Sequence, residues 1–163
     1  MDEGCVVKKC SFSYDFPTGK IYIAEGDGAI TDVAFRPVPG SIEKETPLIL
    51  ETAKMLREYF EGKRKVFDLP LRPVGTEFQL KAWNALLTIP YGQTRSYKEQ
   101  AEAVGNIKAC RAVGMANGKN PISIIIPCHR VVGADGSLVG FGGGVDAKQA
   151  LLDLEKSKED DSD

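Results

Sequence analysis

Alternating and helically spaced apolar residues divide the chain into two regions with different predicted elements. Over 20–25 the isoleucines at 21 and 23 alternate with Tyr22 and Ala24, further apolar residues follow at 30, 33 and 35, and Gly-Asp-Gly at 26–28 separates the two segments. This pattern predicts two strands joined by a turn. Helical spacing after Pro47 predicts a helix that ends near Gly62, and a short strand is predicted over 66–69. The first seventy residues are therefore predicted to form a small α/β unit.

The second region begins where Pro70, Pro73 and Gly75 interrupt the chain, with the domain boundary between Leu71 and Gly75, and its patterns are mainly helical. Thr-x-x-Gln at 76–79 and Ser-x-x-Glu at 96–99 are capping boxes, and helical patterns follow them. Two further helices are predicted over 107–116 and 146–156. This region is thus predicted to be mainly α-helical.

The helices predicted from Ser96 and over 107–116 are joined by a Gly-Asn turn, which is the outline of a helix-turn-helix. The second helix carries one long cation, Arg111, among small side chains. Small side chains allow another molecule to approach closely, but they also occur where helices pack tightly inside a protein. The pattern alone leaves both interpretations open.

The composition favours one large or two small globular domains. Hydrophobic residues make up 42% of the 163 residues and charged residues 27%, so the chain can bury a core. It has no apolar run of the roughly 18 residues that span a bilayer and no signal-like apolar segment near Met1. We therefore expect no membrane segment and a cytoplasmic protein, or a nuclear one in a eukaryote.

The four cysteines lack C-x-x-C spacing and the sequence has one histidine, so we expect reduced thiols and no metal.

The net charge of −2 conceals an uneven distribution of charged residues. Residues 1–72 carry −1, residues 73–157 carry +2 and residues 158–163 carry −3. Within 81–130, seven basic residues accompany two acidic ones, a local excess of +5. Such an excess suits a surface that contacts phosphates, although a solvated helix face has the same composition.

Cys128 and His129 form the most distinctive motif, near the end of an apolar run that starts at Pro121 and is predicted to be a buried strand. A cysteine attacks as its thiolate, and a nearby imidazole or positive charge lowers the pKa of the thiol. The pair is therefore a candidate nucleophile and base. A buried, unreactive cysteine beside a surface histidine would give the same dipeptide, so the pair alone does not settle the chemistry.

The sequence around this pair resembles the active-site signature of the O6-alkylguanine-DNA alkyltransferases, also called methylated-DNA–protein-cysteine methyltransferases. The segment at 120–132 reads Asn-Pro-Ile-Ser-Ile-Ile-Ile-Pro-Cys-His-Arg-Val-Val. Further segments in the order and spacing of that family lie at 89–97, 111–114, 140–143 and 151–155. The resemblance is strong from about Gly75 to Glu155, and over the first seventy residues it concerns the general layout.

The resemblance implies a single-use repair reaction without a cofactor. Cys128 would attack the alkyl carbon on O6 of guanine, with O4 of thymine as a second candidate, and keep the alkyl group irreversibly as a thioether. His129 would act through a water as the base toward Cys128, and Glu155 would orient His129. Asn120 would brace the turn and Tyr97 would donate a hydrogen bond to the base. Such a displacement needs an anionic nucleophile, an aligned attack and stabilisation of the departing oxygen.

The resemblance also implies how DNA is bound. The partner is double-stranded DNA containing O6-alkylguanine, which a monomer contacts through the minor groove. The damaged nucleotide is flipped out because its alkyl carbon is hidden in the stack. Arg111 would fill the gap that the flipped base leaves. The residues expected at the DNA are Tyr97, Cys110, Arg111, Ala112 and Gly114. The residues expected in the alkylguanine pocket are Val131, Phe141, Gly142 and Gly143, with the amide of Gly142 pointing at O6.

Two positions depart from some family members, which have a tyrosine in place of Phe141 and a proline in place of Ser123. The range of accepted alkyl groups therefore does not follow from the resemblance. The N-terminal zinc site of some members lacks its histidines in this chain.

The predicted organisation is an α/β N-terminal domain at 1–72, ribonuclease-H-like by resemblance, followed by a mainly α domain at 73–157. The second domain would bind DNA through a winged-helix-like helix-turn-helix and carry out alkyl transfer, and an acidic tail covers 158–163. Two alternatives stay open. One is a damage-binding protein that shares the scaffold without reacting, although such relatives lack the attacking cysteine. The other is a cysteine hydrolase that uses Cys128 and His129, in which the helix carrying Arg111 would have no role.

Overall fold

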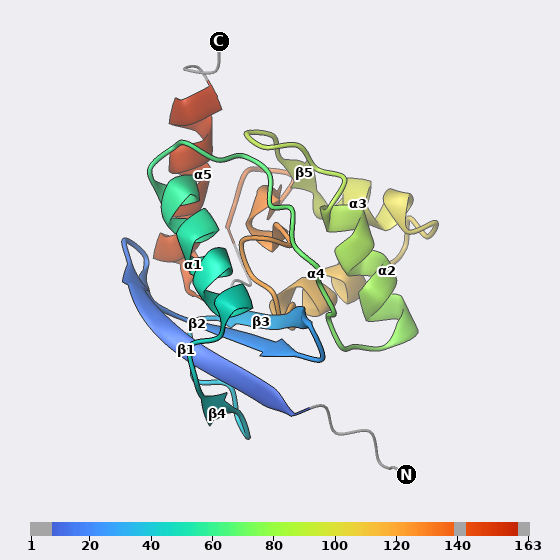
Figure 1. Ribbon diagram of the computed structural model, residues 1–163. Helices are drawn as coiled ribbons and strands as arrows, with labels where there is room; N and C mark the ends of the chain where they lie inside the picture. The colour runs from blue at the N-terminus through green and yellow to red at the C-terminus, as the bar shows by residue number, and fades with distance from the viewer. Residues whose placement is uncertain (1–7, 139–142, 160–163) are drawn as a thin grey trace. The chain divides into compact units, whose positions relative to one another are not determined.

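The computed structural model describes residues 8–138 and 143–159. The chain divides into two compact units, Met1–Pro73 and Val74–Asp163 (Figure 1). An α/β N-terminal region is followed by a mainly helical region, as the sequence predicts. No helix in the described ranges is long and apolar enough to cross a membrane.

The N-terminal unit is a four-stranded sheet packed against one helix. Its elements are β1 (Lys9–Phe16), β2 (Gly19–Gly26), β3 (Ala29–Ala34), β4 (Ile42–Glu43) and α1 (Pro47–Phe60). The first three strands form an antiparallel meander and β4 pairs in parallel with β1, which gives the order β3-β2-β1-β4. Ile21 and Ile23 of β2 and Leu56 and Tyr59 of α1 are fully buried and form the core of this unit.

Local signals set the ends of α1 and confirm the predicted helix. The Thr46 hydroxyl accepts a hydrogen bond from the Ile49 N–H at 3.2 Å, and Pro47 takes a position where no N–H is needed. Just after the helix, Gly62 has a φ of +78°, a left-handed conformation that glycine adopts without strain.

The prediction of a strand over 66–69 is wrong, and β1 was not predicted from the sequence. Residues 66–69 are irregular, and this part of the chain pairs with the sheet through a single bridge between Ile30 and Leu71. Pro70 and Pro73 flank that bridge and have no N–H to extend the ladder. A longer pairing at this sheet edge is therefore blocked.

The C-terminal unit is mainly helical. Its elements are α2 (Glu77–Leu86), β5 (Arg95–Ser96), α3 (Tyr97–Ala103), α4 (Cys110–Gly118), the 3₁₀ turn η1 (Cys128–Arg130), β6 (Val131–Val132) and α5 (Val145–Glu159). β5 and β6 form a short parallel pair. Helices α2, α3 and α4 pack together around a core of small side chains (Figure 1). This core consists of Ala82, Ala101, Ala109, Val113 and Ala116.

Both predicted capping boxes are present, at the starts of α2 and α3. The boundaries predicted for the following helix are shifted, because α4 begins three residues after 107 and ends two residues after 116. Its start is delayed because the Asn106 side chain accepts the Lys108 N–H at 3.0 Å and forms a turn. Asn117, expected to end the helix, lies inside it.

A buried pair of amides joins α3 to α4. Gln100 donates to Asn117 Oδ1 at 2.9 Å, and Asn117 donates back to Gln100 Oε1 at 2.8 Å. Gln100 also donates to the Ala82 carbonyl on α2 at 3.1 Å, and Trp83 Nε1 donates to the Ala116 carbonyl at 2.8 Å. The three helices are therefore fixed together by hydrogen bonds as well as by packing.

Candidate active site around Cys128

A buried turn, and not the predicted strand, leads to Cys128. Residues 123–125 form a turn between an isolated bridge at 122 and a bend at 126, and every residue from 122 to 126 is buried. Asn120 holds this segment at both ends, since its oxygen accepts the Ile122 N–H at 3.0 Å and its nitrogen donates to the Ile126 carbonyl at 2.8 Å. Ile124 has a φ of +72°, which is strained for a β-branched residue. An apolar run predicts burial, but it does not distinguish a strand from a turn that side-chain hydrogen bonds hold.

The Cys-His-Arg triplet forms η1 and is buried as a whole. Cys128 is 4% exposed, His129 is 0% exposed and Arg130 is 7% exposed. The Cys128 N–H donates to the Ile126 carbonyl at 2.8 Å. His129 is therefore a buried histidine that needs hydrogen-bond partners, and the alternative of a surface histidine is wrong.

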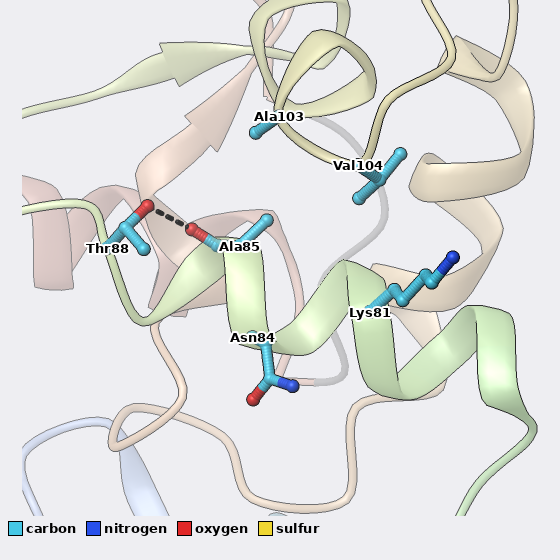
Figure 2. A pocket seen from close by; sticks show the side chains of 6 residues that line it. All are labelled: Lys81, Asn84, Ala85, Thr88, Ala103 and Val104. Carbon is cyan, nitrogen blue, oxygen red and sulfur yellow. Dashed lines mark hydrogen bonds between the residues drawn. The ribbon is translucent and has the colours of Figure 1, made fainter.

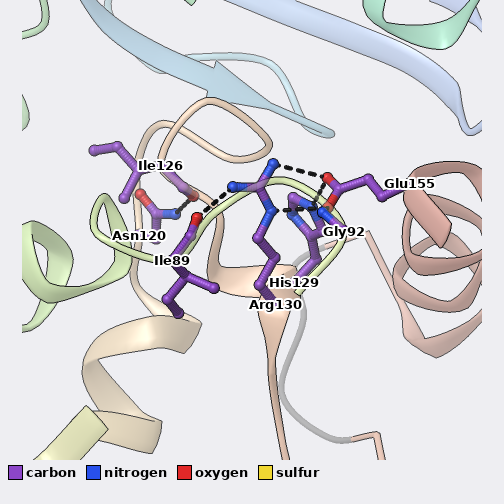
Figure 3. A network of polar contacts seen from close by, with 7 residues as sticks. All are labelled: Ile89, Gly92, Asn120, Ile126, His129, Arg130 and Glu155. Carbon is purple, nitrogen blue, oxygen red and sulfur yellow. Dashed lines mark hydrogen bonds and ion pairs between the residues drawn. The ribbon is translucent and has the colours of Figure 1, made fainter. Parts of the chain in front are cut away.

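Glu155 on α5 is the centre of the polar network in this site (Figure 3). Its Oε2 atom accepts hydrogen bonds from His129 Nε2 at 2.6 Å and Arg130 Nη2 at 3.1 Å. Its Oε1 atom accepts from Arg130 Nε at 2.8 Å and from the Gly92 N–H at 3.2 Å. The carboxylate is 1% exposed, so these donors replace the water that it loses on burial.

The network sets the protonation states of Glu155 and His129. Burial alone would raise the pKa of Glu155, but the hydrogen bonds and charges of His129 and Arg130 outweigh it and lower the pKa to about 2. Burial lowers the pKa of His129, and the nearby Glu155 only partly opposes this. An ionised carboxylate can only accept, so the proton of the neutral imidazole lies on Nε2. His129 Nδ1 then carries the lone pair, and it is buried without a hydrogen-bond partner in the described part of the chain.

Two further side chains are electrostatically coupled to Cys128. Burial raises the pKa of the Cys128 thiol, while the Asn120 side chain and the charge of Lys148 oppose the increase. Lys148, on α5, is 1% exposed; burial lowers its pKa and the Cys128 charge opposes this. The pKa of Tyr97 is raised by burial and by the Cys128 charge. Negative charge on the Cys128 sulfur is therefore favoured by Lys148.

Comparison with known proteins identifies the family. A family model for the 6-O-methylguanine DNA methyltransferase DNA binding domain matches residues 77–157, and a model for the ribonuclease-like domain of the same family matches residues 11–73. This chain belongs to the 6-O-methylguanine DNA methyltransferase family. It is 47% identical over 150 residues to the methylated-DNA–protein-cysteine methyltransferase of Methanosarcina acetivorans. The aligned residues cover 88% of this chain and 96% of the relative.

Solved structures of family members agree with this assignment. The crystal structure of Mycobacterium tuberculosis O6-methylguanine methyltransferase matches with a TM-score of 0.85 and 43% identity, covering 92% of this chain and 94% of that chain. A crystal structure of Mycobacterium tuberculosis OGT in complex with DNA matches with a TM-score of 0.85 and 44% identity, covering 91% and 94%. The similarity therefore extends over most of the chain.

Sequence reasoning missed two charged residues that the structure places at the site of this family member. Arg130 was counted as one of the basic residues of the 81–130 segment, and Lys148 was not singled out. One signal was available for Lys148, because Lys148, Leu151 and Glu155 are spaced at three and seven residues and share one helix face. All three are buried. Charged residues on the apolar face of a helix point to a polar site beneath it.

The predicted DNA-contacting residues lie on α4 and at the start of α3. Arg111 and Ala112 are exposed, and Cys110 and Gly114 are half-buried. Gly114 lies against Tyr97, since a Cβ built at this glycine would be 3.6 Å from Tyr97 Cε1. Arg111 makes no hydrogen bond or ion pair with the residues that the structure describes, so its guanidinium is available to a partner.

The expected alkylguanine pocket is described only in part. Val131 on β6 is fully buried, Ser123 is 6% exposed and Gly143 is half-buried. Phe141 and Gly142 lie outside the described residues. Across residues 8–138 and 143–159, no group of three or more His, Cys, Asp or Glu side chains is arranged to hold a metal ion.

A separate groove lies between α2 and α3 (Figure 2). It has a volume of about 380 Å³ and is lined by Lys81, Asn84, Ala85, Thr88, Ala103 and Val104. The hydrogen bond drawn in it, from the Thr88 hydroxyl to the Ala85 carbonyl at 2.6 Å, belongs to the end of α2. None of these side chains takes part in the Glu155 network, so the groove is distinct from the candidate active site.

Proposed function

We propose that this chain repairs alkylated DNA by transferring an alkyl group, in the first instance methyl, from O6 of guanine to the thiol of Cys128. The proposal is supported by one observation above all. A buried Cys128 lies beside a neutral histidine whose Nε2 is bound to Glu155, in a chain that belongs to a methyltransferase family over both units. O4 of thymine is a second candidate position in the same reaction.

The proposed reaction is a displacement at the alkyl carbon. The Cys128 proton passes through a water to His129 Nδ1, and the sulfur attacks the carbon in line with the C–O6 bond. As that bond breaks, its electron pair stays on the base, which Tyr97 stabilises by donating a hydrogen bond. The proton finally reaches the base, so the products are guanine and S-alkylcysteine. No step regenerates the thiol, and each protein molecule therefore reacts once.

The proposed partner is double-stranded DNA, which a monomer binds in the minor groove through α4. The damaged nucleotide is flipped into a pocket formed by Val131, Phe141, Gly142 and Gly143, and Arg111 takes its place in the stack. The base must leave the stack because a buried sulfur cannot reach an alkyl carbon inside the duplex.

The distribution of ion pairs supports a DNA-binding surface on the C-terminal unit. Of the seven basic side chains at 81–130, Arg130 alone pairs with a carboxylate among the residues that the structure describes. In the N-terminal unit, by contrast, five basic side chains form such pairs, namely Lys9, Lys20, Lys63, Arg64 and Arg72. Basic side chains without carboxylate partners suit phosphate contacts, and binding should weaken steeply as salt increases.

Mass spectrometry of the intact protein tests the proposal. The protein is incubated with duplex DNA that carries one O6-methylguanine, and Cys128→Ser serves as the control. We expect the mass to increase by one methyl group in place of a hydrogen, the modification to map to Cys128, and the reaction to stop at one group per protein. Tight binding to the lesion without a mass change would favour the damage-binding alternative. Neither binding nor transfer, together with turnover of a small acyl substrate, would favour the hydrolase.

A further inference from the structure

Arg130 has no part in the reaction proposed above, yet its side chain makes three hydrogen bonds in the site (Figure 3). Its Nε and Nη2 atoms donate to the two oxygens of Glu155 at 2.8 and 3.1 Å, and its Nη1 atom donates to the Ile89 carbonyl at 2.7 Å. Its guanidinium also lies over the Tyr91 ring, 5.7 Å from the ring centre. Arg130 therefore fixes the position of α5 relative to the turn that follows α2.

Arg130 also balances a buried charge. The cation of Arg130 and the anion of Glu155 cancel, and His129 beside them is neutral. Among the residues that the structure describes, the other charged group that acts on His129 is Lys148 on α5. A buried carboxylate without its counter-charge takes up a proton more readily. Without Arg130, the Glu155–His129 pair would therefore take up an extra proton at a higher pH than it does with Arg130 present, and the two groups would share that proton.

That extra proton would abolish the acceptor on His129 wherever it resided. If it is on the imidazole, both ring nitrogens carry hydrogen and neither can accept. If it is on Glu155, the carboxylic acid donates to Nε2, and the proton of the neutral ring moves to Nδ1. In both cases His129 Nδ1 no longer has a lone pair for the Cys128 proton.

We propose that Arg130 is a positioning residue, which holds Glu155 as a fixed anion and thereby keeps His129 Nδ1 available to accept the Cys128 proton. The effect of Arg130 on alkyl transfer rests on the proposed function. The protonation state of His129 is a property of the protein without DNA, and it can be measured even if the proposed function is wrong.

The experiment uses the fact that His129 is the only histidine in the sequence. In protein labelled with ¹⁵N-histidine, the two ring signals need no assignment to a residue, and they report the tautomer and its titration directly. The variants are Arg130→Met, which removes the charge, and Arg130→Lys, which keeps the charge but lacks the planar guanidinium that can donate to two oxygens at once. Arg72→Met is the matched control, because Arg72 pairs with Asp27 at 2.7 Å on the surface, outside the Glu155 network. Single-turnover methyl transfer is measured on the same samples from acidic to alkaline pH.

We expect the wild type and Arg72→Met to show the Nε2–H tautomer over the same pH range. In Arg130→Met, proton uptake by the His129–Glu155 pair should move to higher pH by about one unit or more. The acid side of the pH–rate profile should move with it. In Arg130→Lys, titration should remain close to wild type while transfer slows at least about tenfold at every pH, because one ammonium group cannot hold both carboxylate oxygens.

The proposal is overturned if folded Arg130→Met keeps the wild-type tautomer and the wild-type pH profile, even if it reacts more slowly. Such a result would mean that Arg130 only stabilises the fold. If Arg130→Met does not fold, Arg130→Lys decides, since wild-type transfer rates in that variant would equally overturn the proposal. If the wild type transfers no methyl group, the proposed function fails, whereas the NMR titration still tests Arg130.

Discussion

Gly114 gives a sharp test of whether α4 contacts DNA, because the fold itself does not require a glycine there. A Cβ built at Gly114 meets Tyr97 Cε1 at 3.6 Å and Cδ1 at 3.7 Å, which are ordinary contacts. Glycine inside a helix is less stable than alanine by about 1 kcal/mol. Gly114→Ala should therefore stabilise the protein by about 1 kcal/mol and raise the Tm by about 2–4 °C in a chain of this size.

The same substitution should weaken DNA binding. One extra methyl group in a close-packed contact typically costs about 1–3 kcal/mol, which corresponds to a Kd about 5-fold to 150-fold higher. Binding is measured by fluorescence anisotropy with duplex DNA containing O6-methylguanine. The measurement is made in the Cys128→Ser background so that no reaction follows binding. The variant would thus be more stable than its parent and bind less tightly.

Gly118→Ala is the control for this test. Gly118 ends the same helix, a Cβ there has no neighbour within 4 Å, and the residue is outside the predicted set of DNA contacts. This variant should bind DNA like its parent. Unchanged affinity in Gly114→Ala would refute the predicted contact, and a lower Tm would refute the packing argument.

Three further predictions concern stability, measured by urea unfolding. Asn120→Ala should lower the free energy of unfolding by about 2–4 kcal/mol, because it leaves a buried N–H and a buried carbonyl without partners. Gln100→Leu should destabilise the protein more than the double variant Gln100→Leu/Asn117→Leu, since the single change leaves a buried amide unpaired; equal losses would contradict this. Stability should fall as the pH drops below 6.5, because the unfolded chain protonates His129 while burial keeps its pKa lower in the folded protein. A further loss should follow as the pH falls from 4.5 toward 2, where Glu155 is still ionised only in the folded state.

The parts of the fold that the sequence predicts are those with local causes. The capping residues Thr46, Thr76 and Ser96 start helices where their side chains can reach the backbone three residues on. β1 was also within reach, since Cys10, Phe12, Tyr14 and Phe16 alternate with polar residues. The conformation of residues 122–126 could not be predicted, because it depends on hydrogen bonds to the side chain of Asn120.

In the candidate site, too, features with local causes can be predicted from the sequence, and features that depend on distant contacts cannot. Cys128 and His129 can be named as a candidate nucleophile and base from their chemistry, and Glu155 and Asn120 can be named as candidates through the resemblance to a family. That Arg130 bonds to Glu155, 25 residues away, depends on how α5 packs against η1. No local pattern predicts this contact, so Arg130 was only counted as one basic residue of the segment at 81–130. The sequence therefore indicates candidate reactive residues but not the charged residues that surround them.

The arrangement of charges explains how a buried thiol can lose its proton. Removing that proton places a negative charge where burial opposes it, and a second anion close by would oppose it further. Glu155 is an anion bonded to the neighbouring His129, and Arg130 balances its charge through two hydrogen bonds. Lys148 is then the cation that favours charge on Cys128. In the proposed reaction the two cations would have different roles, since Arg130 would fix where the proton of His129 lies and Lys148 would favour the thiolate that remains when His129 accepts another.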